Sequence, residues 1–221
     1  MISLGRVLAT SAGTLLLSGT LVGLTAGSAH ADSTWSGTLT TGISAIAVGT
    51  EDRTGYSRDL FDHWVDADGD GCDTREEVLI SEAEEAPTIG SGCSLSGGRW
   101  YSYYEGASQT SASALDIDHL VPLAEAWDSG ARTWTAARRE AYANDMGDTR
   151  SLVGVTASYN RSKGDQDVAE WLPPINQCRY VKEWVAAKIR WSLTADSTEV
   201  GALQDVAAGC TDSAITVTVV S

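Results

Sequence analysis

Hydrophobic and polar positions alternate in some stretches of the chain and follow a helical period in others. Alternation at residues 116–121 predicts a short strand that Pro122 limits. Residues 151–155 predict a second strand, and Thr156 can cap a short helix directly after it. A helix capped by Thr135 is expected at residues 136–146, and an amphipathic helix at residues 179–193. Residues 215–219 alternate again and predict a final strand.

The part of the chain before residue 115 has weaker patterns. Residues 35–51 fit either a helix or a strand, and residues 78–80 fit a strand. Residues 93–106 are expected to form a hairpin with its turn at Gly97-Gly98, and residues 107–114 a linker. The aromatic residues at 100–104 are expected to pack in a core, with stacking on nucleic-acid bases as the alternative.

The chain has a basic residue, Arg6, near its start, continues with a small and apolar run, and reaches Ala29-His30-Ala31. This order is typical of a secretory signal peptide, here residues 1–31, cleaved before Asp32. No later stretch is apolar and long enough to span a bilayer. We therefore expect a secreted, extracellular monomer without a membrane segment, with one domain over residues 32–221.

Four cysteines follow the expected cleavage site, and none of them form a Cys-x-x-Cys pair. In an exported chain this favours two disulfides over a metal cluster. Three pairings are open.

Residues 66–77 match the twelve-position calcium loop. Acids stand at positions 1, 3, 5 and 12 (Asp66, Asp68, Asp70 and Glu77), and position 7, Cys72, would contribute its carbonyl. The flanking residues do not read as two clear helices. The alternatives are therefore a Ca²⁺ site and an acidic turn that leads into a strand.

The candidate catalytic and metal-binding residues are concentrated in two later stretches of the chain. Residues 116–123 read Asp-Ile-Asp-His-Leu-Val-Pro-Leu, and residues 160–165 read Asn-Arg-Ser-Lys-Gly-Asp. Together they offer an imidazole base, oxygen donors for a hard metal ion and cations for a phosphate, which are the components of metal-assisted phosphodiester hydrolysis.

Asp-His-x-x-Pro on one strand, then a second strand and a helix with Asn-Arg-x-Lys-Gly-Asp, resembles the HNH, or ββα-metal, endonuclease superfamily. The resemblance is greatest to secreted bacterial proteins akin to the C-terminal nuclease domain of GmrSD-type restriction enzymes. It implies an α+β fold with a ββα-metal core at about residues 116–174. It also implies His119 as general base and Asp118 and Asn160 as ligands of Mg²⁺, or of Mn²⁺.

The resemblance further implies cleavage of DNA, with RNA as the alternative, to 5′-phosphate and 3′-hydroxyl ends. It favours the disulfides Cys72–Cys93 and Cys178–Cys210, and each of these bonds closes a local loop.

Three features leave alternatives open. Arg161 and Lys163 are candidates for phosphate contacts or for a solvated helix end. Ser151 stands where much of the superfamily has an asparagine that orients the histidine, so either Ser151 or a backbone carbonyl has to hold the imidazole.

The third feature is charge. The formal net charge is −15, although residues 119–191 carry 10 Lys and Arg against 9 Asp and Glu. We therefore expect weak, salt-sensitive binding of nucleic acid. The alternative function is an exported calcium-binding interaction module on an inactive nuclease scaffold.

Overall fold

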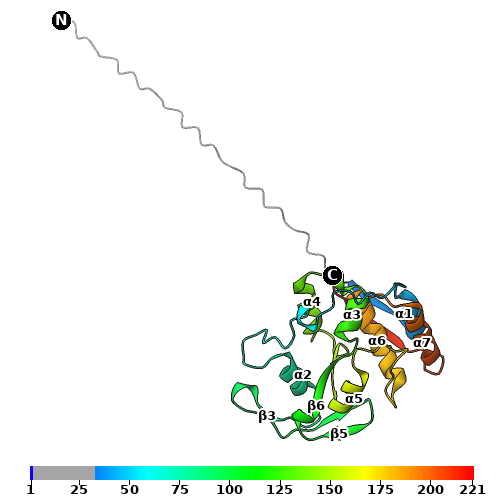
Figure 1. The fold of residues 1–221 in the computed structure, drawn as a ribbon. Coiled ribbons are helices and arrows are strands. Elements are labelled where there is room, and N and C mark those ends of the chain that lie inside the picture. The colour runs from blue at the N-terminus through cyan, green and yellow to red at the C-terminus, as the bar shows by residue number, and fades with distance from the viewer. Residues whose placement is uncertain (2–32) are drawn as a thin grey trace. The chain divides into compact units, whose positions relative to one another are not determined.

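A computed structural model describes Met1 and residues 33–221 of the protein (Figure 1). Apart from Met1, the predicted signal peptide lies outside the described residues. The described part mixes helices with small antiparallel sheets, which confirms the predicted α+β class. Within it, no helix has the length and apolar character needed to cross a membrane.

The sheets pair two strands each. They are β1 (Ser33–Thr38) with β8 (Ala214–Val219), β2 (Thr88–Ile89) with β3 (Leu95–Ser96), β4 (Trp100–Ser102) with β5 (Ala107–Gln109), and β6 (Leu115–His119) with β7 (Leu152–Thr156). The helices are α1 (Leu39–Ala45), α2 (Thr74–Glu82), α3 (Leu123–Asp128), α4 (Ala136–Ala143), α5 (Ala157–Lys163), α6 (Gln177–Trp191) and α7 (Ser197–Ala207).

The β6–β7 pair and α5 confirm three elements predicted from the sequence. Asp118 lies opposite Val153 in the antiparallel register. In Figure 1, β6 lies between α2 and α5. Side chains alternate across a strand, so Val153 joins the larger hydrophobic core while Leu152 joins the smaller core with α2. Because α5 starts directly after β7, its side chains return to the end of β6.

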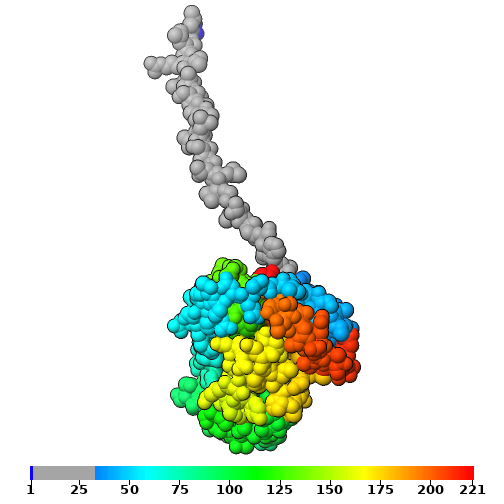
Figure 2. All heavy atoms as spheres, turned by 45° about the vertical axis from the view of Figure 1, so that its right-hand side comes forward, coloured from blue at the N-terminus to red at the C-terminus, as the bar shows by residue number. Residues whose placement is uncertain are grey.

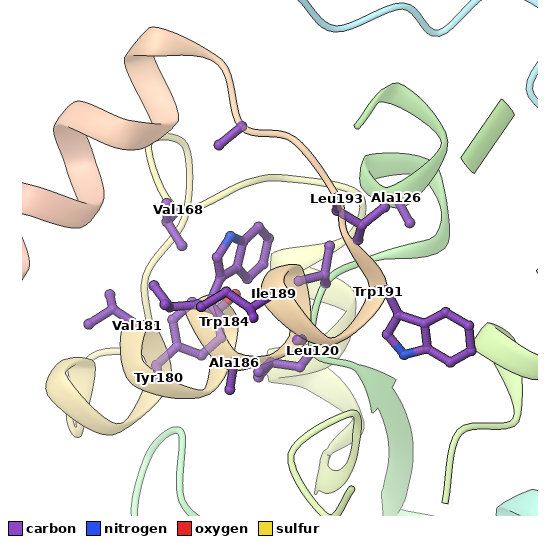
Figure 3. Packing of buried hydrophobic residues seen from close by; sticks show 14 of the residues in the cluster. Leu120, Ala126, Val168, Tyr180, Val181, Trp184, Ala186, Ile189, Trp191 and Leu193 are labelled. Atoms are coloured by element: carbon purple, nitrogen blue, oxygen red, sulfur yellow. The ribbon is translucent and has the colours of Figure 1, made fainter. Parts of the chain in front are cut away.

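The predicted amphipathic helix is α6, and it lies at the centre of the larger core (Figure 3). Tyr180 and Trp184 are fully buried, and Leu120 after β6 packs in the same cluster. Burying a side chain of this size stabilises a fold by about 1.5–3 kcal/mol. Of the aromatic residues at 100–104, Trp100, Tyr103 and Tyr104 are buried as expected, whereas Tyr101 is 44% exposed.

Several local predictions were wrong or incomplete. Residues 78–80 belong to α2 and not to a strand, because Asp73 caps this helix by accepting a hydrogen bond from Arg75 N. Residues 93–106 do not form one hairpin, since the strands on either side of Gly97-Gly98 pair with other partners. The stretch from residue 35 holds both a strand and a helix, and the expected linker contains β5.

The disulfides are Cys72–Cys93 and Cys178–Cys210, as predicted. The first ties the acidic loop before α2 to the segment before β3. The second ties the start of α6 to the segment after α7. Their loops span 21 and 32 residues, which corresponds to about 3–4 kcal/mol of stabilisation each on the loop-entropy relation.

Candidate active site

The end of β6 and helix α5 line one pocket of about 220 Å³. The polar residues that line it are Arg58, Asp118, His119, Asn160, Arg161 and Asp165. The structure thus brings the Asp-His pair and the Asn-Arg pair, which are forty residues apart in the motif, to one place. Figure 2 shows the chain near residues 50–65 (cyan) directly above the chain near residues 155–170 (yellow), on either side of this region.

His119 is 5% exposed and is held by the backbone. Its Nε2 lies 2.8 Å from the Ala143 carbonyl oxygen. Because a carbonyl only accepts hydrogen bonds, Nε2 carries the proton and Nδ1 keeps a free lone pair. Nδ1 makes no hydrogen bond within residues 33–221, and it is not one of the polar atoms buried there without a partner. The imidazole can therefore accept a proton at Nδ1.

The surroundings keep this imidazole neutral. Burial lowers the pKa of His119 to about 3, and the nearby positive charges of Arg58, His63 and Lys163 act in the same direction. A hydrogen bond to the Ala143 carbonyl opposes the shift. At neutral pH His119 is consequently unprotonated, which is the form that a general base requires.

Ser151 does not hold the histidine. Its hydroxyl donates to Asp145 Oδ2 at 2.6 Å instead. Of the two alternatives that the sequence left open, the structure therefore has the backbone carbonyl, supplied by the last residue of α4.

Asp118 lies in a buried ion pair with Lys163. The Lys163 ammonium donates to Asp118 Oδ1 at 2.7 Å and Oδ2 at 2.6 Å, and the Tyr104 hydroxyl donates to the same carboxylate. Burial raises the pKa of Asp118 and lowers that of Lys163, while the contact between the opposite charges counteracts both shifts. Asp118 is 4% exposed and Lys163 is 0% exposed.

This placement does not match the predicted contact between Lys163 and a substrate phosphate. All three donors of the ammonium are used, the third by the His119 carbonyl oxygen at 2.9 Å. Gly164, with φ +57, ends α5 immediately after Lys163. The Lys163 side chain holds Asp118 and the end of β6 together.

Asn160 and Arg161 both contact Asp116, a residue whose role the sequence did not reveal. Asn160 Nδ2 lies 3.4 Å and Arg161 Nε 3.2 Å from Asp116 Oδ2. Asp116 and Asp118 are two positions apart on β6, so both carboxylates face α5. This alternation along the strand was the signal in the sequence from which the position of Asp116 beside α5 could have been predicted. The Arg161 side chain is 74% exposed and remains accessible to a ligand.

The oxygen donors at the pocket suit a hard divalent ion. A carboxylate offers about four acceptor positions, and Asp118 uses three of them on Lys163 and Tyr104. Asn160 Oδ1 accepts no hydrogen bond within residues 33–221. Asp118 and Asn160 can therefore each supply one oxygen, the donor type that Mg²⁺ and Mn²⁺ prefer. The nearby ammonium of Lys163 weakens such binding.

The segment at residues 58–64 contributes one residue to the pocket and ring contacts to His119, which the sequence did not reveal. Arg58 lines the pocket, and the ring of Trp64 lies 5.6 Å from that of His119. Trp64 has φ +64, a strained conformation that non-glycine residues seldom adopt outside functional or tightly packed places. His63 Nδ1 contacts the Phe61 carbonyl at 2.9 Å and serves packing.

A larger pocket, of about 560 Å³, lies beside the Cys178–Cys210 disulfide. Arg150, Arg179 and Lys182 line it, but it contains no histidine and no amide side chain. The smaller pocket is therefore the better candidate for the active site, because it contains both a histidine and an amide side chain.

The acidic loop at residues 66–77 folds back on itself. Gly69 N and Gly71 N donate to the Asp66 carboxylate at 2.8 and 3.0 Å. Oxygens of Asp66, Asp68 and Asp70 lie within 4.8 Å of one another. A helix follows the loop, α2, but none precedes it within residues 61–73. The loop thus has one of the two helices of an EF-hand, and the Ca²⁺ site stays a prediction.

Comparison with known proteins extends over most of the described chain. Residues 74–206 match the family described as GmrSD restriction endonucleases, C-terminal domain. A protein from the fungus Arthroderma benhamiae, described as an uncharacterized secreted protein, is 40% identical over 174 residues, which cover 78% of this chain and 83% of that protein. No solved structure matches the chain. The chain therefore belongs to the family of GmrSD restriction endonuclease C-terminal domains, which is of the HNH type.

Proposed function

We propose that the protein is an exported, metal-dependent endonuclease that hydrolyses phosphodiester bonds of DNA, with RNA as the alternative substrate. Membership of an HNH-type nuclease family supports a nuclease. The observation that carries the proposal is the single pocket that joins His119, Asp118 and Asn160. The β6–β7 pair and α5 are then the ββα-metal core. The secreted relative and the two disulfides support an extracellular location.

His119 is the general base. Its Nδ1 takes a proton from a water molecule, and the water oxygen forms a bond to phosphorus while the bond from phosphorus to the 3′ oxygen breaks. The 3′ oxygen takes a proton from solvent, so the products are a 5′-phosphate and a 3′-hydroxyl. The Ala143 carbonyl, through its contact with Nε2, keeps the ring in the tautomer that this step needs.

Asp118 and Asn160 are the proposed ligands of Mg²⁺ or Mn²⁺. When bound, the ion offsets the negative charge that develops on the phosphate and on the leaving oxygen. Lys163 and Tyr104 fix the Asp118 carboxylate in place. Lys163 therefore acts on the substrate through Asp118 and not by direct contact.

Arg161 is the proposed phosphate contact on α5. It is exposed, and its bond to Asp116 is long enough at 3.2 Å to be exchanged for a phosphate oxygen. The overall charge of −15 repels nucleic acid, so binding should be weak. Because binding relies on contacts between cationic side chains and phosphates, it should weaken further as the salt concentration rises.

Conversion of supercoiled plasmid, with Mg²⁺ and with a chelator, tests the proposal on the purified protein. We expect His119→Ala to lower the cleavage rate by about 10²–10⁴-fold, the usual contribution of a general base. Asn160→Ala should also lose activity. Ser158→Ala, on the exposed side of α5, is the matched control and should cleave like the parent.

Folding of each variant is checked by its thermal melting curve. Parent-like cleavage by both His119→Ala and Asn160→Ala would remove this site from the mechanism. Cleavage that persists in the presence of chelator would show that the reaction does not need a metal ion.

A second candidate function is an exported calcium-binding module without nuclease activity. The observation in its favour is the close approach of the Asp66, Asp68 and Asp70 carboxylates. It predicts calcium binding together with no plasmid cleavage under any metal condition, so the same assay separates the two functions.

A further inference from the structure

Of the three cationic side chains at the site, Arg58 and Arg161 line the pocket and Lys163 does not, and two of the three are already paired with carboxylates. Lys163 is buried against Asp118, and Arg161 contacts Asp116. Arg58 is exposed and forms no ion pair within residues 33–221. Within the described residues no carboxylate pairs with the Arg58 guanidinium, so its charge and its N–H donors are available to a ligand.

The backbone around Arg58 is fixed from both sides. Arg58 begins a short 3₁₀ helix, Arg58–Leu60, and its carbonyl accepts a hydrogen bond from Phe61 N at 3.0 Å. Phe61 is fully buried and its ring packs against Trp127 and Tyr142. The 3₁₀ helix is thus anchored in the core, and it presents Arg58 at the pocket beside His119.

We propose that Arg58 binds a phosphate of the nucleic-acid backbone in this pocket, an inference that rests on the proposed function. A guanidinium presents two parallel N–H donors that match two oxygens of a phosphate. Arg161 lines the same pocket from α5, so a bound phosphodiester would lie between two arginines from distant parts of the chain. Arg58 lies before residue 74, where the family match begins.

The test measures cleavage and binding separately. Cleavage of a fluorescent DNA duplex with Mg²⁺ gives kcat and KM for the parent, Arg58→Ala and Arg58→Lys. Fluorescence anisotropy gives the Kd of the same duplex over a range of salt concentrations, with each variant combined with His119→Ala so that the duplex stays intact. Arg99→Ala is the matched control, because it removes the same charge from an exposed site that does not line the pocket.

We expect Arg58→Ala to lower kcat/KM and to weaken Kd by roughly 10- to 100-fold, the range for losing hydrogen bonds to a charged group. Its plot of log Kd against log salt should lose about one unit of slope, as for one lost phosphate contact. Arg58→Lys should fall between Ala and the parent, and Arg99→Ala should stay within about twofold of the parent because distant surface charges are screened.

Cleavage and binding by Arg58→Ala that equal those of Arg99→Ala would overturn the role of Arg58 and leave the nuclease proposal standing. A parent protein that binds DNA without cleaving it would overturn the nuclease proposal, and the binding comparison would still decide on Arg58. A parent that neither binds nor cleaves would refute both.

Discussion

Replacing Lys163 by Met should be one of the most damaging single changes in the protein. The ammonium is fully buried, contacts both oxygens of Asp118 at 2.6–2.7 Å and also holds the His119 carbonyl. Met has a similar length but no charge, so Asp118 would be left in the interior with only Tyr104 as partner. Removing one member of a buried pair costs about 3–5 kcal/mol.

Arg161→Met is the matched control in the same helix. Its partner Asp116 lies on the same strand as Asp118, but the Arg161 side chain is 74% exposed. Exposed pairs contribute about 0–1 kcal/mol. The two substitutions remove one positive charge each from neighbouring ion pairs, so the difference between them isolates the effect of burial.

Urea unfolding followed by tryptophan fluorescence measures both variants. We expect the free energy of unfolding to fall by about 3–5 kcal/mol for Lys163→Met and by no more than about 1 kcal/mol for Arg161→Met. Adding Asp118→Asn to Lys163→Met should cost little or restore stability, because it removes the stranded charge. Similar losses for the two single variants, or additive losses in the double variant, would refute the reasoning.

Other predictions concern pH, calcium and the disulfides. Burial raises the pKa of Glu82 to about 7, so the folded state holds the proton longer than the unfolded state and stability should fall as pH rises from about 5 to about 7. Denaturation midpoints at both pH values should show a smaller fall in Glu82→Gln; an unchanged fall would contradict this. Calorimetric titration should show a heat of calcium binding in the parent and in Glu76→Ala but not in Asp70→Ala. Equal heat in all three proteins would exclude the loop as the calcium site. Replacing Cys178 and Cys210 by Ser should lower the free energy of unfolding by about 3–4 kcal/mol, and an unchanged urea midpoint would contradict that value.

Local signals in the sequence were sufficient for β6, β7, α5 and α6. Alternation, a proline after β6 and helical spacing over α6 depend only on neighbouring residues. Residues 78–80 show the limit of such signals. Three β-branched and aliphatic residues suit a strand, but the Asp73 cap and packing on β6 and β7 place them in a helix.

Burial of charged groups could not be read from the sequence. The motif lysine has the position of a phosphate contact, yet tertiary packing places it against Asp118. Likewise, nothing local to Ser151 shows that Asp145 captures its hydroxyl. The ring of His119 is held instead by a carbonyl, and backbone carbonyls occur at every position of a chain.

The remaining site residues come from parts of the chain outside the motif. Arg58 reaches the pocket because Phe61 anchors its segment in the core, a contact between positions far apart in sequence. Alternation along β6 could have predicted that Asp116 faces α5, but its importance follows from its hydrogen bonds to α5.

The central claim is that the pocket between β6 and α5 holds the metal ion of a hydrolytic site. Anomalous scattering from crystals soaked in Mn²⁺ measures this directly. We predict a manganese peak within coordination distance of Asn160 Oδ1 and the Asp118 carboxylate, lost in crystals of Asn160→Ala. Manganese found only at the acidic loop of residues 66–77, with none beside Asn160, would contradict the claim.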